Sequence, residues 1–195
     1  SLNQVLHSTQ FIKGPDVSEF ERDLEKYLGV NNAIACGSGT DALQIALMSL
    51  ELNPGEEIIT TDFTFAATIE VILLLGLKPI LVDIDPKTFN IDPNKVKEAL
   101  TKKTKAIIPV HLFGQISNMD EILNIAKENK LFIIEDNAQS MGSTYTFLNG
   151  EKKKAGTIGD IGTTSFFPSK NLGAYGDGGA IFTDDNEFAD RIRAI

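Results

Sequence analysis

Seven short apolar runs alternate with segments of helical spacing along the chain, and this alternation limits the possible folds more than any other feature of the sequence. We expect strands at Ala33–Cys36, Glu57–Thr61, Pro79–Ile84, Ala106–His111, Leu131–Glu135, Gly162–Phe167 and Gly179–Thr183. We expect helices at Thr40–Glu51, Phe65–Leu75, Pro93–Thr101, Met119–Asn129 and Asn186–Ile195. Apolar strands separated by helices are typical of a mostly parallel sheet that is covered on both faces. The sequence therefore predicts an α/β fold with a seven-stranded sheet sandwiched by helices.

The remaining segments add a helical entry and a surface loop. Within residues 1–29, Phe20, Leu24 and Leu28 recur every fourth residue and Gly29 offers a stop, which predicts a helix. The lysine-rich segment Tyr145–Ala155 predicts an exposed hairpin loop. No linker or repeat divides the 195 residues, so we expect a single domain.

Composition and charge exclude several classes of protein. A formal net charge of −9 disfavours nucleic-acid binding, which needs clustered lysine and arginine. The single Cys36 cannot form an internal disulfide and is expected to be a small buried hydrophobic residue, and the two histidines form no zinc-site pattern. The longest apolar run, Val71–Leu75, is too short to cross a membrane, and no secretory signal is visible. We therefore expect a cytoplasmic protein without a metal.

A lone lysine, Lys170, stands between two β-prone apolar runs and beside a cluster of glycines. Phe166, Phe167 and Pro168 precede it, and desolvation beside apolar groups favours the neutral form of an amine. A neutral lysine amine can attack a carbonyl and form a Schiff base. The same pattern also fits a lysine whose stem lies along a strand end while its charge stays in water. This stretch alone leaves both interpretations open.

The residues that follow the first predicted strand suggest an anion site. In parallel sheets, ligands bind at the carboxyl ends of the strands. Here Gly37, Ser38, Gly39 and Thr40 lead directly into a helix, a pattern that favours phosphate binding by free N–H groups and the helix dipole. The alternative is an ordinary turn in which Ser38 or Thr40 caps the helix. The spacing matches neither a P-loop nor a dinucleotide-binding motif.

Three further residues lie near predicted strand ends. Phe65 could stack on a planar ligand or pack in the core. Asp136 follows an apolar strand, where a carboxylate needs a partner: a protonated ring nitrogen of a ligand, an internal ion pair, or a helix cap. His111 is interpreted as a hydrogen-bonded structural residue rather than a general base.

These parts together, with Ser165 five positions before Lys170, fit pyridoxal 5'-phosphate, which carries a phosphate, a planar ring, a basic nitrogen and an aldehyde. The same residues carry a family resemblance. Six ordered segments resemble the DegT/DnrJ/EryC1/StrS family of nucleotide-sugar aminotransferases: Gly37–Leu43, Phe63–Thr68, Val82–Asp85, Pro109–Gly114, Glu135–Gln139 and Ser165–Gly173.

The resemblance implies a role for each candidate residue. Lys170 matches the lysine that forms the Schiff base, and Asp136 matches the partner of the pyridine nitrogen, which it keeps protonated. Gln139 matches the contact to the phenolic oxygen of the ring, and Phe65 the stacking aromatic residue. The phosphate cradle would comprise Ser38, Gly39, Thr40 and Ser165. Once displaced by a substrate amine, Lys170 is expected to move the proton.

The resemblance also implies a reaction. An amino acid, usually L-glutamate, would give its amino group to a keto group of a nucleotide-linked sugar, in amino-sugar biosynthesis for a surface polysaccharide or glycoconjugate. Dehydratases of the family carry histidine in place of the lysine, so Lys170 favours transamination. Phe167–Gly173 followed by Tyr175–Gly179 is more similar to members that aminate C3 of the sugar than to those that aminate C4.

Members of this family are nearly twice as long as this chain. Residues 1–195 would then form the large, pyridoxal-phosphate-binding domain of fold type I, with a C-terminal small domain outside this sequence. The resemblance implies a homodimer whose subunits share the active site. A non-catalytic protein of the same fold, either a regulator or a truncated paralogue that binds cofactor or a partner without turnover, stays open as an alternative. A nucleotide-binding module of another class is a more distant one.

Overall fold

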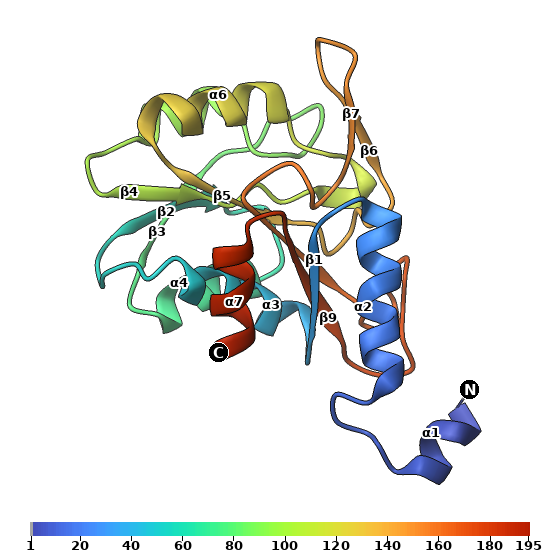
Figure 1. The fold of residues 1–195 in the computed structure, drawn as a ribbon. Helices are drawn as coiled ribbons and strands as arrows, with labels where there is room; N and C mark the ends of the chain where they lie inside the picture. Colours follow the sequence, from blue (N-terminus) through green and yellow to red (C-terminus); the bar gives the residue numbers. More distant parts are fainter. Residues whose placement is uncertain (1) are drawn as a thin grey trace.

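The computed structural model describes residues 2–195 and centres on a seven-stranded sheet (Figure 1). Across the sheet, the strand order is β1-β9-β8-β5-β4-β2-β3. The strands are β1 (Asn32–Cys36), β2 (Glu57–Thr61), β3 (Lys78–Val82), β4 (Thr104–Ile107), β5 (Phe132–Asp136), β8 (Ile161–Ser165) and β9 (Gly179–Thr183). β9 runs antiparallel to both of its neighbours, whereas all other pairs are parallel. The predicted α/β architecture is confirmed.

Helices cover the two faces of this sheet, and a small hairpin projects from it (Figure 1). The helices are α1 (Leu2–Ser8), α2 (Pro15–Leu28), α3 (Gly39–Ser49), α4 (Ala67–Leu74), α5 (Pro93–Ala99), α6 (Met119–Asn129) and α7 (Asn186–Ala194), with a 3₁₀ turn η1 (Leu112–Gly114). The hairpin pairs β6 (Thr144–Thr146) with β7 (Lys152–Lys154), which confirms the predicted hairpin at Tyr145–Ala155. Within residues 2–195, every helix is too short or too polar to cross a bilayer.

Alternating strand residues build a separate core on each face, because successive side chains of a strand point to opposite sides. Ile58 and Ile134 pack with apolar residues of α3, α4 and α7. Their neighbours Ile59 and Ile133 pack with residues of α5 and α6 on the other face. At the β1 end of the sheet, α2 covers Phe182. Two-sided burial fixes the strands, so residues at their carboxyl ends are held in place.

Several predicted boundaries were confirmed and others shifted for identifiable reasons. The bounds of β2, β9 and α6 agree with those predicted. The strand expected at Ala106–His111 ends at Ile107, because Pro109 has no N–H to continue the ladder, and Val110 meets Asp136 only in an isolated bridge.

Three further boundary shifts appear early in the chain. The strand expected at Pro79–Ile84 is β3, and Ile84 pairs instead with Ile91. The helical entry is split into α1 and α2, since Thr9 and Lys13 between them adopt left-handed φ angles of 55° and 47°. The helix expected from Phe65 begins at Ala67, which leaves Phe65 outside the helix.

Candidate functional site

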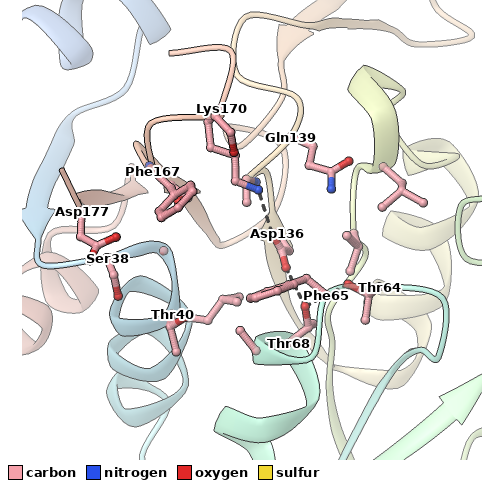
Figure 2. Close-up of a pocket in the computed structure, with 18 residues that line it drawn as sticks. Ser38, Thr40, Thr64, Phe65, Thr68, Asp136, Gln139, Phe167, Lys170 and Asp177 are labelled. Carbon is pink, nitrogen blue, oxygen red and sulfur yellow. Dashed lines mark hydrogen bonds between the residues drawn. The ribbon is translucent and has the colours of Figure 1, made fainter. Parts of the chain in front are cut away.

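A cavity of about 430 Å³ lies at the carboxyl edge of the sheet, where β5 and β8 end. Figure 2 shows the residues around it. All eight residues that the sequence predicted for the site line this cavity: Ser38, Gly39, Thr40, Phe65, Asp136, Gln139, Ser165 and Lys170. They come from four separate segments of the chain, and the fold brings them together.

The start of α3 forms one wall of the cavity. The Ser38 side chain caps the helix by accepting a hydrogen bond from the Asp41 N–H at 3.1 Å. The N–H groups of Gly39 and Thr40 precede the first helical hydrogen bond, and they have no acceptor within residues 2–195. Free N–H groups at the start of an 11-residue helix attract an anion. Ser38 can therefore cap the helix while the N–H groups of Gly39 and Thr40 stay available to an anion.

Two glycines bring three chain segments into contact at this wall. A Cβ atom on Gly39 would lie 2.6 Å from the Ser165 Cβ at the end of β8. A Cβ atom on Gly179, at the start of β9, would overlap the carbonyl group of Ser38. Only glycine permits this approach of backbone to backbone. As a result, Ser165 lies beside Gly39 at the start of α3, and these residues form a cradle at the wall of the cavity.

Asp136 is a buried carboxylate at the carboxyl end of β5, with 5% of its surface exposed. Its Oδ2 accepts a hydrogen bond from the Thr68 hydroxyl at 2.8 Å, and its Oδ1 accepts one from the Ala138 N–H at 3.2 Å. Within the described chain, no lysine, arginine or histidine forms an ion pair with it. The internal ion pair considered for Asp136 is therefore wrong, and a cationic group of a ligand suits this position.

Phe65 lies on the segment between β2 and α4, with 71% of its surface exposed. Its side chain lines the cavity (Figure 2). The alternative that Phe65 packs in the core is therefore wrong. An exposed ring at the mouth of a cavity offers a stacking face to a planar ligand.

Lys170 is half-buried on the loop between β8 and β9, and its side chain points into the cavity (Figure 2). The loop is held by a hydrogen bond from the Lys170 N–H to the Phe167 carbonyl at 2.8 Å. Phe167 also lines the cavity, whereas Phe166 packs against Phe20 with ring centroids 5.2 Å apart. The expectation that both phenylalanines flank the amine is thus correct only for Phe167.

Gln139 lies on the turn after β5. Its Oε1 accepts a hydrogen bond from the Phe113 N–H at 2.9 Å. Because the oxygen is occupied, the amide NH₂ group is the part of Gln139 that remains to donate to a ligand in the cavity.

Two residues interpreted as structural behave in that way. His111 is buried and its Nε2 lies 2.7 Å from Oε2 of buried Glu135, while its Nδ1 accepts from the Ser117 N–H at 3.3 Å. Since Nδ1 is an acceptor, the hydrogen of the ring is on Nε2. His111 Nε2 therefore donates the hydrogen bond that Glu135 accepts. Cys36 is partly buried against the core and its thiol donates to the Ser38 carbonyl at 3.3 Å. Burial is the main cause that raises the pKa of Cys36 to about 11.

Four polar residues of the cavity lining were not predicted from the sequence: Thr64, Thr68, Ser169 and Asp177. Thr64 and Thr68 stand four residues apart at the junction of β2 and α4, and this spacing was the available signal. Asp177 lies in the glycine-rich segment before β9. Among the described residues that line the cavity, Lys170 is the single basic one, whereas Asp136 and Asp177 are two acidic ones.

Comparison with known proteins identifies the family. A profile of the DegT/DnrJ/EryC1/StrS aminotransferase family matches residues 1–195. The chain belongs to this family. It is 52% identical over 194 residues to a pleiotropic regulatory protein of Geobacillus stearothermophilus. It is 49% identical over 194 residues to the UDP-2-acetamido-2-deoxy-3-oxo-D-glucuronate aminotransferase of Pseudomonas aeruginosa.

These alignments cover 100% of this chain but 51% and 53% of the two relatives. The chain thus spans about half the length of the curated relatives it matches. The crystal structure of NtdA from Bacillus subtilis with bound cofactor PMP is similar, with a TM-score of 0.89 and 45% identity, covering 98% of this chain and 42% of that chain. At this level of identity, the likeness confirms the predicted aminotransferase fold.

Proposed function

We propose that this chain is the large domain of a pyridoxal-phosphate-dependent aminotransferase that transfers an amino group to a keto group of a nucleotide-linked sugar. The observation that carries the proposal is Asp136: a buried carboxylate without a basic partner among residues 2–195, in the same cavity as the cradle and a lysine amine. Family membership of the whole described chain supports it.

The residues of the cavity fit each part of the cofactor. The free N–H groups of α3, together with Ser165, would hold its phosphate, and Asp136 would hold its protonated ring nitrogen. The Phe65 ring would stack on the ring face, and the NH₂ group of Gln139 would donate to the phenolic oxygen. The polar groups match their proposed partners in charge or hydrogen-bonding capacity, and Phe65 matches its partner as a flat apolar face.

Lys170 and Asp136 would carry the chemistry of the chain. When bound, pyridoxal 5'-phosphate supplies an electron sink for the carbon that bears the nitrogen. The Asp136 carboxylate would pair with the ring nitrogen and favour its protonated form. The Lys170 Nζ would hold the aldehyde carbon at rest and, once free, would move a proton from the substrate carbon to that same aldehyde carbon. Phe65 and Phe167 would limit access of water to that amine.

For the substrates, we propose L-glutamate as the donor and C3 as the position of the acceptor carbonyl. The name of the Pseudomonas aeruginosa relative, which specifies a UDP-linked 3-oxo sugar, supports the acceptor. The product would serve a surface polysaccharide or glycoconjugate, and the reaction would take place in the cytoplasm.

We further propose a homodimer whose subunits share the active site. A cofactor phosphate and a nucleoside diphosphate bring several negative charges, yet Lys170 is the single basic residue of the described cavity lining. Further cationic groups must therefore come from outside residues 2–195 or from a second copy. Sedimentation of the whole protein would test the homodimer. Activity regained when two inactive variants are combined in one mixed dimer would test the shared site.

An absorbance spectrum of the purified protein with pyridoxal 5'-phosphate tests the central proposal. We expect a yellow band that borohydride removes, with the reduced adduct on the peptide that contains Lys170. Lys170→Ala should show no covalent adduct. A wild-type protein without a band, or an adduct on another lysine, would refute the assignment.

A non-catalytic regulator is the second candidate, because the Geobacillus stearothermophilus relative is named a pleiotropic regulatory protein. The two candidates differ in turnover. The whole protein is mixed with L-glutamate and a UDP-linked 3-keto sugar, and formation of 2-oxoglutarate and the amino sugar is followed. Cofactor binding without any product would favour the regulator.

A further inference from the structure

Two threonines connect the rim of the cavity to the Asp136 carboxylate. Thr68 lies in the first turn of α4 and is fully buried, and its Oγ1 is 2.8 Å from Asp136 Oδ2. Thr64 lines the cavity four residues earlier, and its Oγ1 is 3.1 Å from Thr68 Oγ1. The three side chains thus form one continuous hydrogen-bonded chain (Figure 2).

The direction of this chain follows from the donors available. An ionised carboxylate only accepts hydrogen bonds, so the single hydroxyl hydrogen of Thr68 is committed to Asp136. Thr68 can then only accept from Thr64, which makes Thr64 the donor of the 3.1 Å contact. Within the described chain, the Thr68 hydroxyl has no partner besides Thr64 and Asp136. It does not cap α4 either, because the cap position of that helix is occupied by Ala66.

This arrangement restrains the orientation of a side chain that is otherwise free to turn. The last torsion of aspartate is broad, because it joins an sp³ to an sp² carbon. Oδ2 accepts a hydrogen bond from Thr68 and Oδ1 accepts one from the Ala138 N–H, so each oxygen of the carboxylate is restrained. The remaining lone pairs of the carboxylate are then available toward the cavity.

We propose that Thr68, supported by Thr64, is a positioning residue that orients and stabilises the Asp136 carboxylate for the ring nitrogen of the cofactor. This inference rests on the proposed function for its ligand, whereas the hydrogen-bonded chain itself exists without any ligand. The proposed role of Thr68 acts only through Asp136, so Thr68 is not a catalytic residue.

Four variants separate this role from general stability. Thr68→Val removes the hydroxyl at nearly constant shape, Thr68→Ser keeps it, and Thr64→Val removes the outer donor. Thr60→Val is the matched control, because Thr60 is equally buried but donates to the Ile108 carbonyl at 2.9 Å, away from the cavity. Each variant is made in the whole protein, and its dissociation constant for pyridoxal 5'-phosphate is measured together with its absorption band.

We expect Thr68→Val to weaken cofactor binding by about 10- to 100-fold and to shift the band, since a hydrogen bond to a charged group is lost. Thr68→Ser should stay within about threefold of wild type, Thr64→Val should lose several-fold, and Thr60→Val should match wild type. Wild-type affinity in Thr68→Val, or equal losses in the serine and valine variants, would overturn the inference. If Thr68→Val does not fold, Thr64→Val decides instead, because Thr64 is partly exposed. Unchanged cofactor binding in Thr64→Val would then overturn the inference.

A ligand-free measurement separates this inference from the proposed function. In protein with ¹³C-labelled aspartate, the carboxyl resonance of Asp136 is assigned with Asp136→Asn. We expect it to shift in Thr68→Val but not in Thr60→Val, with no cofactor present. A wild-type protein that does not bind the cofactor would refute the proposed function, while an unshifted resonance would refute the role of Thr68.

Discussion

Replacing Glu135 by glutamine tests how the strand end that carries the site is held. Glu135 is fully buried, and its two oxygens accept four hydrogen bonds: from His111 Nε2 (2.7 Å) and the N–H groups of Gly156 (2.9 Å), Ile158 (2.5 Å) and Gly159 (2.7 Å). Glutamine keeps the shape but turns one oxygen into an NH₂ group. That group would face donors instead of an acceptor.

The magnitude follows from the number of donors left without a partner. If the amide oxygen serves Ile158 and Gly159, the NH₂ group meets the N–H of Gly156 and the proton on His111 Nε2. Each unsatisfied buried donor costs about 1–3 kcal/mol, and removal of one partner of a buried pair costs about 3–5 kcal/mol. A tautomer change at His111 does not help, since Nδ1 would then face the Ser117 N–H. We therefore expect Glu135→Gln to lower the free energy of unfolding by about 3–5 kcal/mol.

Urea denaturation of the wild type and Glu135→Gln measures this difference as a shift in the midpoint at constant slope. Glu121→Gln is the control, because Glu121 pairs at 3.3 Å with Lys97 and both side chains are exposed. Such a surface pair contributes at most about 1 kcal/mol. A loss of less than about 1 kcal/mol in Glu135→Gln would refute the reasoning, because the four donors would then not depend on the charge.

The same comparison has a predicted pH dependence. Burial raises the pKa of Glu135, but the hydrogen bonds from His111 and from the N–H groups of Gly159 and Gly156 outweigh it, so the pKa lies below its ordinary value of 4.5. Because the folded-state pKa is depressed, the stabilising effect is complete above about pH 4.5 and is lost as the pH falls through the folded-state value. The stability gap between wild type and Glu135→Gln should therefore shrink in acid. A gap that stays constant from pH 7 into strong acid would contradict this.

Two further predictions concern the cradle and its neighbour. Gly179→Ala should destabilise the protein by about 1–3 kcal/mol and weaken cofactor binding, because its Cβ would overlap the Ser38 carbonyl. Gly176→Ala should change neither property, because a Cβ atom there has no neighbour within 4 Å. Urea denaturation measures the stability and a titration measures cofactor binding, and equal behaviour of the two variants would argue against a tight cradle. Cys36, whose pKa is raised from 9.0 to about 11, should react with a thiol reagent at pH 8 about 100-fold more slowly in the folded than in the urea-unfolded protein, and equal rates would show an exposed thiol.

Much of this site could be predicted because its residues are tied to strand ends that are visible in the sequence. Asp136 follows a run of apolar residues, so a carboxylate at the carboxyl edge of the sheet was expected there, and the structure places it there. The start of α3 was predicted from Ser38 and the glycines around it. Local patterns suffice for such residues, because the strand or helix itself positions them. Their roles toward a cofactor are still a proposal.

Other features depend on contacts between distant segments, which periodicity does not encode. The reversed direction of β9 and its pairing with β1 could not be read from either run. Thr68 looks like any residue of a helical first turn until β5 brings Asp136 to it. The position of the Phe65 side chain was ambiguous because the start of α4 depends on packing. The helix begins two residues later than predicted, and this difference places the Phe65 ring at the cavity instead of in the core.

The pairing of β1 with β9 also bears on how the protein acquires its site during folding. Gly179 is aligned with both Cys36 of β1 and Ser165 of β8, so the cradle joins residues from near the beginning and near the end of the described chain. Contacts of such sequence separation form late, because the entropy of closing a long loop must first be overcome. A nascent chain therefore cannot assemble this cradle until β9 has inserted between its neighbours. Once it has, any ligand of the cradle draws the equilibrium toward the fully paired sheet.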